Sequence, residues 1–134
     1  MSNTKIAVYG TLKKHRGNHR LLQGVPFIGK GKTVNKFTML AHGIPYVLKN
    51  LPKVQISVEV YDVSPEDLVN LDSLEGHPRW YRREPTDIKL EDNSLVSAEL
   101  YFYTPYESVT DEDELKKVME KSNYYLKEVT NGIF

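Results

Sequence analysis

The sequence predicts an α+β fold, in which strands form a strongly twisted sheet or a small barrel and helices are inserted between them. Three observations lead to this prediction. Residues 54–63 alternate between apolar and polar side chains, which is the period of a half-buried strand. Residues 64–75 begin with a serine, a proline and two acids and then repeat leucine at helical spacing. Residues 81–104 contain two strand-like runs joined by a short polar turn, which is typical of a hairpin.

The N-terminal part of the chain is expected to hold short strands separated by turns. Its elements are, in order, a buried strand at 5–9 that ends at Gly10, a polar loop at 13–17, a short helix at 18–23 closed by Gly24, one or two bent strands at 27–40, and a turn and strand at 42–48. Gly29 and Gly31 indicate a twist or a close backbone approach within the bent strands.

The C-terminal part is expected to combine strands with two helices. Its elements are, in order, a strand at 54–63, a helix capped by Ser64, strands at 81–90 and 95–104, and a last helix that begins near Thr110 and ends at about Lys127. The apolar faces of the two helices are expected to be Leu68, Leu71 and Leu74, and Leu115, Val118, Met119 and Tyr125.

The composition limits the classes of protein to which the chain can belong. Its length fits a single domain at 1–134. The formal net charge is zero, so no global attraction to nucleic acid or to an anionic membrane is expected. Cysteine is absent, which excludes disulfides, thiolate nucleophiles and cysteine-bound zinc. No apolar run is long enough for a signal peptide or a membrane span, and these features together fit a cytoplasmic protein.

The segment Tyr9-Gly10-Thr11-Leu12 is a candidate binding loop, because it directly follows the first predicted strand. Gly10 allows a positive φ, so the backbone amides after it can point into one cavity and bind an anion or an oxyanion. Thr11 adds a hydroxyl group. An ordinary turn at the end of a strand explains the same residues, because a short glycine turn is a weak motif.

Glu75 is the candidate proton carrier, because it lies where the predicted helix ends, just before Gly76 and Pro78. Asp72 lies three residues earlier and projects from the same helical face. Paired carboxylates can raise a pKa and thereby create a general acid or base. The alternative is that both carboxylates are solvated on an exposed helix.

Other polar groups give weaker indications. Residues 79–83 interleave arginine with Trp80 and Tyr81, and with the basic residues at 13–20 they predict either a rim for an anion or a surface for single-stranded nucleic acid. The neutral net charge argues against nucleic acid. His15 and His19 have the spacing of a helical metal pair, but no further ligand group lies nearby in the sequence, so no metal site is expected.

Several segments of the chain occur in the order that one known family has. They are Val8-Tyr9-Gly10-Thr11-Leu12, Asn18-His19-Arg20-Leu21-Leu22, Gly43-Ile44-Pro45, Val58-Glu59-Val60-Tyr61, Leu71-Asp72-Ser73-Leu74-Glu75-Gly76, Tyr81-Arg82-Arg83 and Ala98-Glu99-Leu100-Tyr101-Phe102-Tyr103. With these segments the chain resembles the gamma-glutamylcyclotransferase-like proteins, and most of all their gamma-glutamylamine cyclotransferase branch. The resemblance runs from about residue 5 to residue 105 and does not extend to the last helix or to 131–134.

The resemblance implies a small mixed, strongly twisted β-barrel flanked by helices, with a cavity at one end. It implies an enzyme, a lyase or acyltransferase, that releases an amine from a γ-glutamyl amine or amide by intramolecular aminolysis and forms 5-oxoproline. The site residues that it implies by position are Glu75 as the catalytic acid and base, and Tyr9, Gly10, Thr11 and Leu12 as the substrate loop, with Tyr81 as either a further wall of the site or a core aromatic.

The same resemblance bears on cofactors and partners. No cofactor is expected, and the expected partner is a small γ-glutamyl molecule rather than nucleic acid or a membrane. The protein is expected to be a monomer or a weak dimer. Two other classes remain open: a non-catalytic protein that holds an amino-acid-like or anionic ligand in the same cavity, and an interaction protein that uses residues 79–82 as its partner surface. The residues do not specify which amine leaves.

Overall fold

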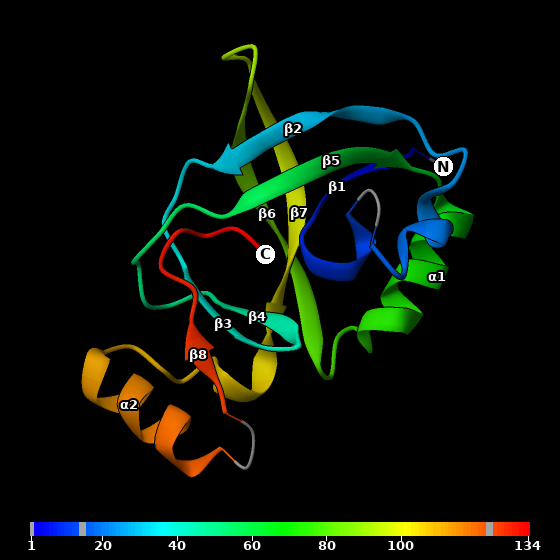
Figure 1. Ribbon diagram of the computed structural model, residues 1–134. Helices are drawn as coiled ribbons and strands as arrows, with labels where there is room; N and C mark the ends of the chain where they lie inside the picture. The colour runs from blue at the N-terminus through cyan, green and yellow to red at the C-terminus, as the bar shows by residue number, and fades with distance from the viewer. Residues whose placement is uncertain (1, 14–15, 123–124) are drawn as a thin grey trace.

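The computed structural model describes residues 2–13, 16–122 and 125–134, without the side chain of Thr11. Its strands form a closed five-stranded barrel and a three-stranded sheet (Figure 1). Neighbouring strands of the barrel are, in order, β1 (Thr4–Val8), β5 (Ser57–Val63), β2 (Phe27–Thr33), β6 (Tyr81–Leu90) and β7 (Leu95–Tyr103). The second sheet consists of β4 (Ile44–Leu48), β3 (Thr38–His42) and β8 (Lys127–Glu128).

The barrel is mixed, as the resemblance predicts. β1 and β7 pair in parallel and close the barrel, whereas the other neighbouring strands pair antiparallel. Its interior is filled by apolar side chains from all sides, among them Ala7, Val58, Val60, Ile88, Leu90, Ala98, Leu100 and Phe102. Because this interior is packed, a ligand must bind outside it, at the ends of the strands or under the covering helices.

One outer side of the barrel is covered by the helix α1 (Pro65–Glu75) and by the short 3-10 helices η1 (Gly10–Leu12) and η2 (His19–Leu22). Leu71 of α1, Leu12 and Leu22 are buried there against Ile6 and Val8 of β1. β5 is therefore buried on both faces, although its alternation predicted a half-buried strand. This cover places the end of α1 beside the substrate-loop candidate.

α1 begins and ends as the sequence predicts. The side chain of Ser64 accepts a hydrogen bond from the amide of Asp67, and Pro65 occupies the first turn. Gly76 ends the helix in the left-handed conformation, with φ 64°. Leu74 departs from the prediction, because 44% of it is exposed and it faces away from the core.

The C-terminal region differs most from the sequence prediction. The helix α2 (Glu112–Lys121) is capped by Asp111 rather than Thr110 and ends well before residue 127. Tyr125 is 87% exposed and does not belong to a helical face, because Ser122 is already extended and the chain continues to β8 beside β3. The strand predicted to begin at residue 54 also differs from the structure. It begins at Ser57, because Val54 forms an isolated bridge with Phe37 instead. η3 (Thr104–Tyr106) follows β7.

Within the described residues, no helix is both long and apolar enough to span a membrane.

Candidate functional site

The substrate-loop candidate is a 3-10 turn that directly follows β1. Gly10 adopts a positive φ of 71°, and the amide of Lys13 donates to its carbonyl at 3.1 Å. A side chain at Gly10 would lie 2.7 Å from Cγ of Pro45, so the loop and Pro45 pack too closely for any other residue. The first amides of such a turn have no acceptor within the turn, which leaves them available to a ligand.

The four loop residues contribute differently. The hydroxyl of Tyr9 donates to the carbonyl of Tyr101 on β7, so this ring joins the loop to the barrel wall. The side chain of Leu12 is buried in the core under α1, and only its backbone can face a ligand. The side chain of Thr11 lies outside the described part of the chain, so the predicted role of its hydroxyl stays a prediction.

Glu75 is the last residue of α1, and its side chain is partly buried. It lines a groove of about 400 Å³ on the molecular surface. Burial raises the pKa of Glu75 from its usual value of 4.5 to about 7. A carboxyl group with this pKa can both accept and donate a proton near neutral pH.

Three tyrosines interact electrostatically with Glu75. Burial raises the pKa of Tyr9, Tyr81 and Tyr101, and the charge of Glu75 raises each of them further. These rings therefore stay protonated, and they place Tyr9 of the loop and Glu75 in one electrostatic environment. The groove lining itself does not include residues 10–12.

Tyr81 connects the two parts of the site. Its hydroxyl donates to the carbonyl of Pro45 at 3.0 Å, and Pro45 in turn contacts Gly10. Its ring lines the groove beside Glu75 and meets the ring of Tyr103 edge-on at 5.2 Å. The structure thus brings Tyr9, Gly10, Tyr81 and Glu75 together, as expected for one site.

Asp72 does not act as the carboxylate partner of Glu75, and this part of the sequence interpretation is wrong. Arg83 binds both oxygens of Asp72, at 2.7 and 2.8 Å, and the hydroxyl of Tyr101 donates to it at 2.7 Å. Burial acts to raise the pKa of Asp72, but the hydrogen bonds from Arg83 and Tyr101 outweigh it and lower that pKa. The raised pKa of Glu75 comes from burial instead.

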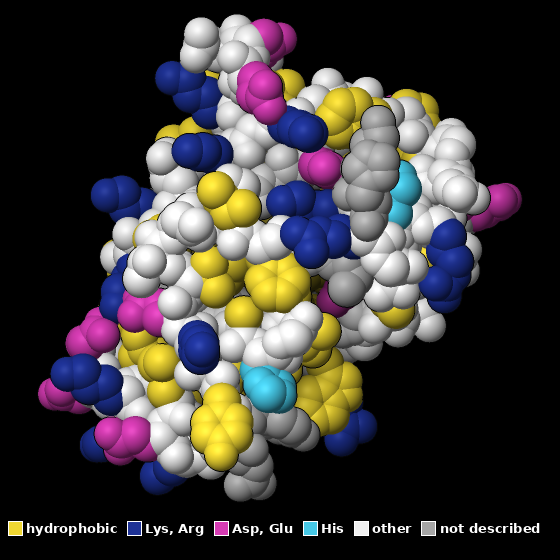
Figure 2. Space-filling view, viewed as in Figure 1, with side chains coloured by type: hydrophobic (Ala, Val, Ile, Leu, Met, Phe, Trp, Pro, Cys, Tyr) yellow, Lys and Arg dark blue, Asp and Glu magenta, His cyan; other side chains and the backbone are white. Residues whose placement is uncertain are grey.

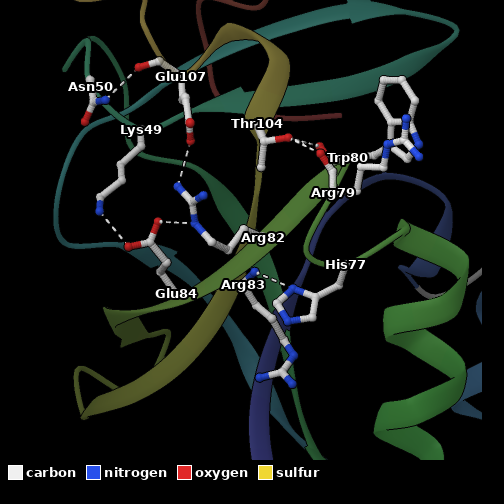
Figure 3. A network of polar contacts seen from close by, with 10 residues as sticks. All are labelled: Lys49, Asn50, His77, Arg79, Trp80, Arg82, Arg83, Glu84, Thr104 and Glu107. Atoms are coloured by element: carbon white, nitrogen blue, oxygen red, sulfur yellow. Dashed lines mark hydrogen bonds and ion pairs between the residues drawn. The ribbon is translucent and has the colours of Figure 1, made fainter.

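Two of the three arginines at 79–83 are paired with acids, whereas the guanidinium of Arg79 lies over the ring of Trp80. Arg82 is paired with Glu84 and Glu107 (Figure 3), and Arg83 is paired with Asp72 and Glu99. Neighbouring acids therefore neutralise both guanidinium groups. The basic residues Lys14 and His15 of the 13–20 segment lie outside the described residues.

Histidine does not build a metal site in the part of the chain that the structure describes. Nδ1 of His19 lies 3.0 Å from the carbonyl oxygen of Leu12, so this ring supports the loop. Among the described residues, no group of three or more histidine, cysteine or acidic side chains could hold a metal ion.

A second cavity of about 470 Å³ lies elsewhere and shares no lining residue with the groove at Glu75. Lys13, Lys30, Lys32 and Lys89 line it together with the buried Glu59. Basic side chains gather on this face of the molecule, near the C-terminus (Figure 2). The sequence interpretation did not group these lysines, because they come from a loop and two separate strands.

Several residues of the groove were not predicted from the sequence. Ile44 and Tyr46 flank Pro45, and Leu74, Trp80 and Tyr103 complete the wall around Glu75. The high tyrosine content was the available signal, but only the pairing of β6 with β7 places Tyr103 opposite Tyr81.

Comparisons with known proteins identify the family to which the chain belongs. The family profile described as "Gamma-glutamyl cyclotransferase, AIG2-like" matches residues 6–126. A candidate gamma-glutamylcyclotransferase of Methanocaldococcus jannaschii is 44% identical over 99 residues, which are 73% of this chain and 82% of that protein. The gamma-glutamylaminecyclotransferase of Rattus norvegicus is 33% identical over 94 residues, 63% of each chain.

A solved structure extends the likeness to three dimensions. The crystal structure of an AIG2-like protein from Mus musculus superposes with a TM-score of 0.71 and 28% identity, covering 85% of this chain and 82% of that one. The profile match spans the barrel, the candidate loop and Glu75. The chain belongs to the gamma-glutamyl cyclotransferase, AIG2-like family of enzymes.

Proposed function

We propose that this protein releases an amine from a γ-glutamyl amine or amide by intramolecular aminolysis and forms 5-oxoproline, as a gamma-glutamylamine cyclotransferase does. Family membership supports the reaction type, and the relative from Rattus norvegicus named a gamma-glutamylaminecyclotransferase supports the amine branch. The observation that carries the proposal is the partly buried Glu75 with a pKa of about 7, beside the loop that follows β1.

The reaction closes a five-membered ring within the substrate. The free α-amine of the γ-glutamyl group attacks its own γ-carbonyl carbon, a C–N bond forms, and the bond to the leaving amine breaks. Both reacting groups belong to one molecule, so proximity favours the attack. The protein has to remove a proton from the α-ammonium, stabilise the tetrahedral oxyanion and protonate the leaving amine.

Glu75 can perform both proton steps in sequence. As a carboxylate it accepts the proton of the α-ammonium, and as a carboxylic acid it donates that proton to the leaving nitrogen. The α-ammonium has to lose two protons to become the N–H of the lactam. The second proton leaves the ring nitrogen as the tetrahedral intermediate collapses, is taken up by the Glu75 carboxylate and passes to the released amine, which departs as an ammonium ion, so the proton balance closes. A pKa near 7 suits both roles, because neither protonation state is strongly disfavoured at neutral pH.

The loop supplies the complementary charge stabilisation. In this proposal, the backbone amides at Gly10, Thr11 and Leu12 hold either the oxyanion or the α-carboxylate of the substrate. Tyr9 and Tyr81 form the walls between this loop and Glu75. The substrate would thus span from the turn after β1 to the end of α1. We further propose that the protein acts in the cytoplasm as a monomer or weak dimer.

The test is to incubate the protein with γ-glutamyl amines, γ-glutamyl amino acids and glutathione and to quantify 5-oxoproline. We expect product from the γ-glutamyl amines, and we expect Glu75→Gln to lower kcat by about a thousandfold while the protein remains folded. Glu66→Gln, an exposed change on the same helix, is the matched control and should leave kcat unchanged.

Two results would contradict the proposal. Normal turnover by Glu75→Gln would remove Glu75 from catalysis. A thermal shift with glutamate-like ligands, without 5-oxoproline from any substrate, would instead identify a binding protein that uses the same site.

A further inference from the structure

The groove beside Glu75 has an unusual chemical lining. We refer to it as the aromatic groove, and its walls are Ile44, Tyr46, Ser73, Leu74, Glu75, Gly76, Trp80, Tyr81 and Tyr103. Three of these residues are tyrosines and one is the only tryptophan of the chain. Glu75 is the one lining residue that carries a charge at neutral pH. The groove therefore offers a ligand apolar and aromatic surface next to a single proton carrier.

Large apolar side chains at its rim remain open to solvent. Trp80 is 51% exposed, Ile44 is 47% exposed and Leu74 is 44% exposed. Exposed apolar residues are common when scattered singly, but a cluster around a concave site indicates a surface that is covered by a ligand. Leu74 is also the helix residue that was expected to face the core and does not.

The rim is held in a fixed position. The amide of Trp80 donates to the carbonyl of Gly76 at 2.9 Å, and the amide of Thr104 donates to the carbonyl of Trp80 at 3.0 Å. A side chain at Gly76 would approach Cδ1 of Trp80 to 2.8 Å, so the indole packs directly on this glycine. Figure 3 shows Arg79 and Trp80 beside Thr104, with the guanidinium carbon of Arg79 5.7 Å from the centre of the indole ring.

The tyrosines of the wall support one another. The ring of Tyr103 meets those of Tyr46, Tyr81 and Tyr106 edge-on, at 4.5, 5.2 and 5.0 Å. Such contacts hold the rings in place before a ligand arrives, so little side-chain entropy is lost on binding. The aromatic groove is thus a preformed surface.

We propose that the aromatic groove binds the substituent of the leaving amine and selects γ-glutamyl conjugates of aromatic or apolar amines. This inference rests on the proposed function. The γ-glutamyl part carries an ammonium and a carboxylate, and no lysine or arginine lines the groove to pair with that carboxylate. The amine substituent, in contrast, begins at the nitrogen that Glu75 protonates, so it extends into the groove that Glu75 lines.

The lining also argues against an amine with a charged end. The ε-amine of lysine carries a second ammonium and a carboxylate at its far end, and no lining residue other than Glu75 could pair with either group. These charges would remain in solvent or meet only the Arg79 guanidinium at the exposed rim, where an ion pair adds little affinity. A phenyl ring, in contrast, can stack against the rings of the wall and remove apolar surface from water.

The experiment compares three substrates that share the γ-glutamyl group: the conjugates of phenethylamine, of n-butylamine and of the ε-amine of lysine. We expect kcat/KM for the phenethylamine conjugate to exceed that for the lysine conjugate at least tenfold, with the butylamine conjugate between them. Trp80→Ala should lower the value for the phenethylamine conjugate about tenfold and that for the lysine conjugate by a much smaller factor. Phe27→Ala, an exposed aromatic outside the groove, is the control and should change neither value.

A second pair of variants tests the aliphatic side of the rim. Leu74→Ala should reduce the preference for the apolar conjugates. Val69→Ala is the matched control, because Val69 is exposed on the same helix but does not line the groove.

Binding can be followed without turnover, because Trp80 is the only tryptophan. In Glu75→Gln, which should hold substrate unreacted, we expect the phenethylamine conjugate to change the tryptophan fluorescence saturably and the lysine conjugate to do so only at much higher concentration. Equal kcat/KM for all three conjugates, or equal fluorescence titrations, would overturn the inference while leaving the cyclotransferase function intact. Failure of all three to yield 5-oxoproline would overturn the proposed function itself.

Discussion

Arg83 holds Asp72 in a two-pronged ion pair, with Nε 2.7 Å from Oδ1 and Nη2 2.8 Å from Oδ2 of the carboxylate. Asp72 is one turn before Glu75 on α1, so the pair joins the barrel strand β6 to the helix that carries the proposed proton carrier. It keeps Asp72 ionised and leaves Glu75 as the carboxyl group of this helix whose proton can move near neutral pH.

Replacing Arg83 by methionine should destabilise the protein by about 2–4 kcal/mol, because it leaves Asp72 and Glu99 partly buried without their cation. The low pKa of Asp72 contributes stability that is present above the usual carboxyl pKa and lost as the pH falls through its folded value. The free energy of unfolding that Arg83→Met loses should therefore be larger at pH 7 than at pH 3, as measured by urea unfolding.

Arg82→Met is the control for this change. Arg82 belongs to the same strand but pairs with Glu84 and Glu107 on the surface, where its side chain is 42% exposed. Exposed pairs contribute on the order of 0–1 kcal/mol, so this variant should be nearly as stable as the parent. If both variants lose the same free energy of unfolding, the Asp72–Arg83 pair contributes no more stability than an exposed ion pair.

Glu75→Gln should raise the stability of the protein relative to the parent at high pH. The folded pKa of Glu75 is about 7, above its usual 4.5, so the folded state binds the proton more tightly and the parent loses stability as the pH rises between these values. The difference between variant and parent should grow by about 3 kcal/mol from pH 4 to pH 8. Unfolding curves at both pH values measure it, and a constant difference would contradict the raised pKa.

The pH dependence of turnover provides an independent measurement of the same group. Since Glu75 must be ionised to accept the first proton, kcat/KM should rise with pH, reach half its maximum near pH 7 and level off above that. An ordinary, solvated glutamate would produce the rise near pH 4.5. If kcat/KM instead rises near pH 4.5, a group other than a buried Glu75 carries the proton.

Gly10→Ala should impair the loop more than the fold. The new Cβ would be 2.7 Å from Cγ of Pro45, and the residue would keep an unfavourable φ of 71°. We expect a loss of stability of about 1–3 kcal/mol and at least a tenfold loss of kcat/KM.

Gly24→Ala separates the effect of the unfavourable φ from the effect of the contact with Pro45. Gly24 has a φ of 77°, but nothing lies within 4 Å of its Cβ position, so this variant has the backbone strain without the contact with Pro45. It should lose stability without a specific loss of kcat/KM. If both variants retain full activity, the turn after β1 does not hold the substrate.

Local sequence signals predicted the features that depend on neighbouring residues. The Ser64 cap, Pro65 and the left-handed Gly76 fix both ends of α1, and so the position of Glu75 is readable from the chain. The turn at Gly10 is equally local. The family resemblance then supplied the mixed barrel, which the strand patterns alone left as a twisted sheet or a barrel.

Features that depend on distant contacts were not predicted. Pairing with Asp72 was one of the causes expected to raise the pKa of Glu75, but Asp72 is held by Arg83 of β6. Tyr9 bonds to the carbonyl of Tyr101, 92 residues away. The end of the last helix was also misplaced, since the pairing of β8 with β3 determines where the chain straightens.

The parallel pairing of β1 with β7 has a consequence for how the protein acquires activity. Only Ile6–Glu99 and Ala7–Leu100 are paired along this contact, and Tyr9 and Tyr101 lie directly beyond it. Contacts between such distant segments form slowly, because a long stretch of chain must be closed first. During synthesis α1 emerges well before β7, and Glu75 is then a carboxylate in water with ordinary acidity. Under the proposed mechanism, the newly made chain would become active only after folding has buried Glu75 and raised its pKa.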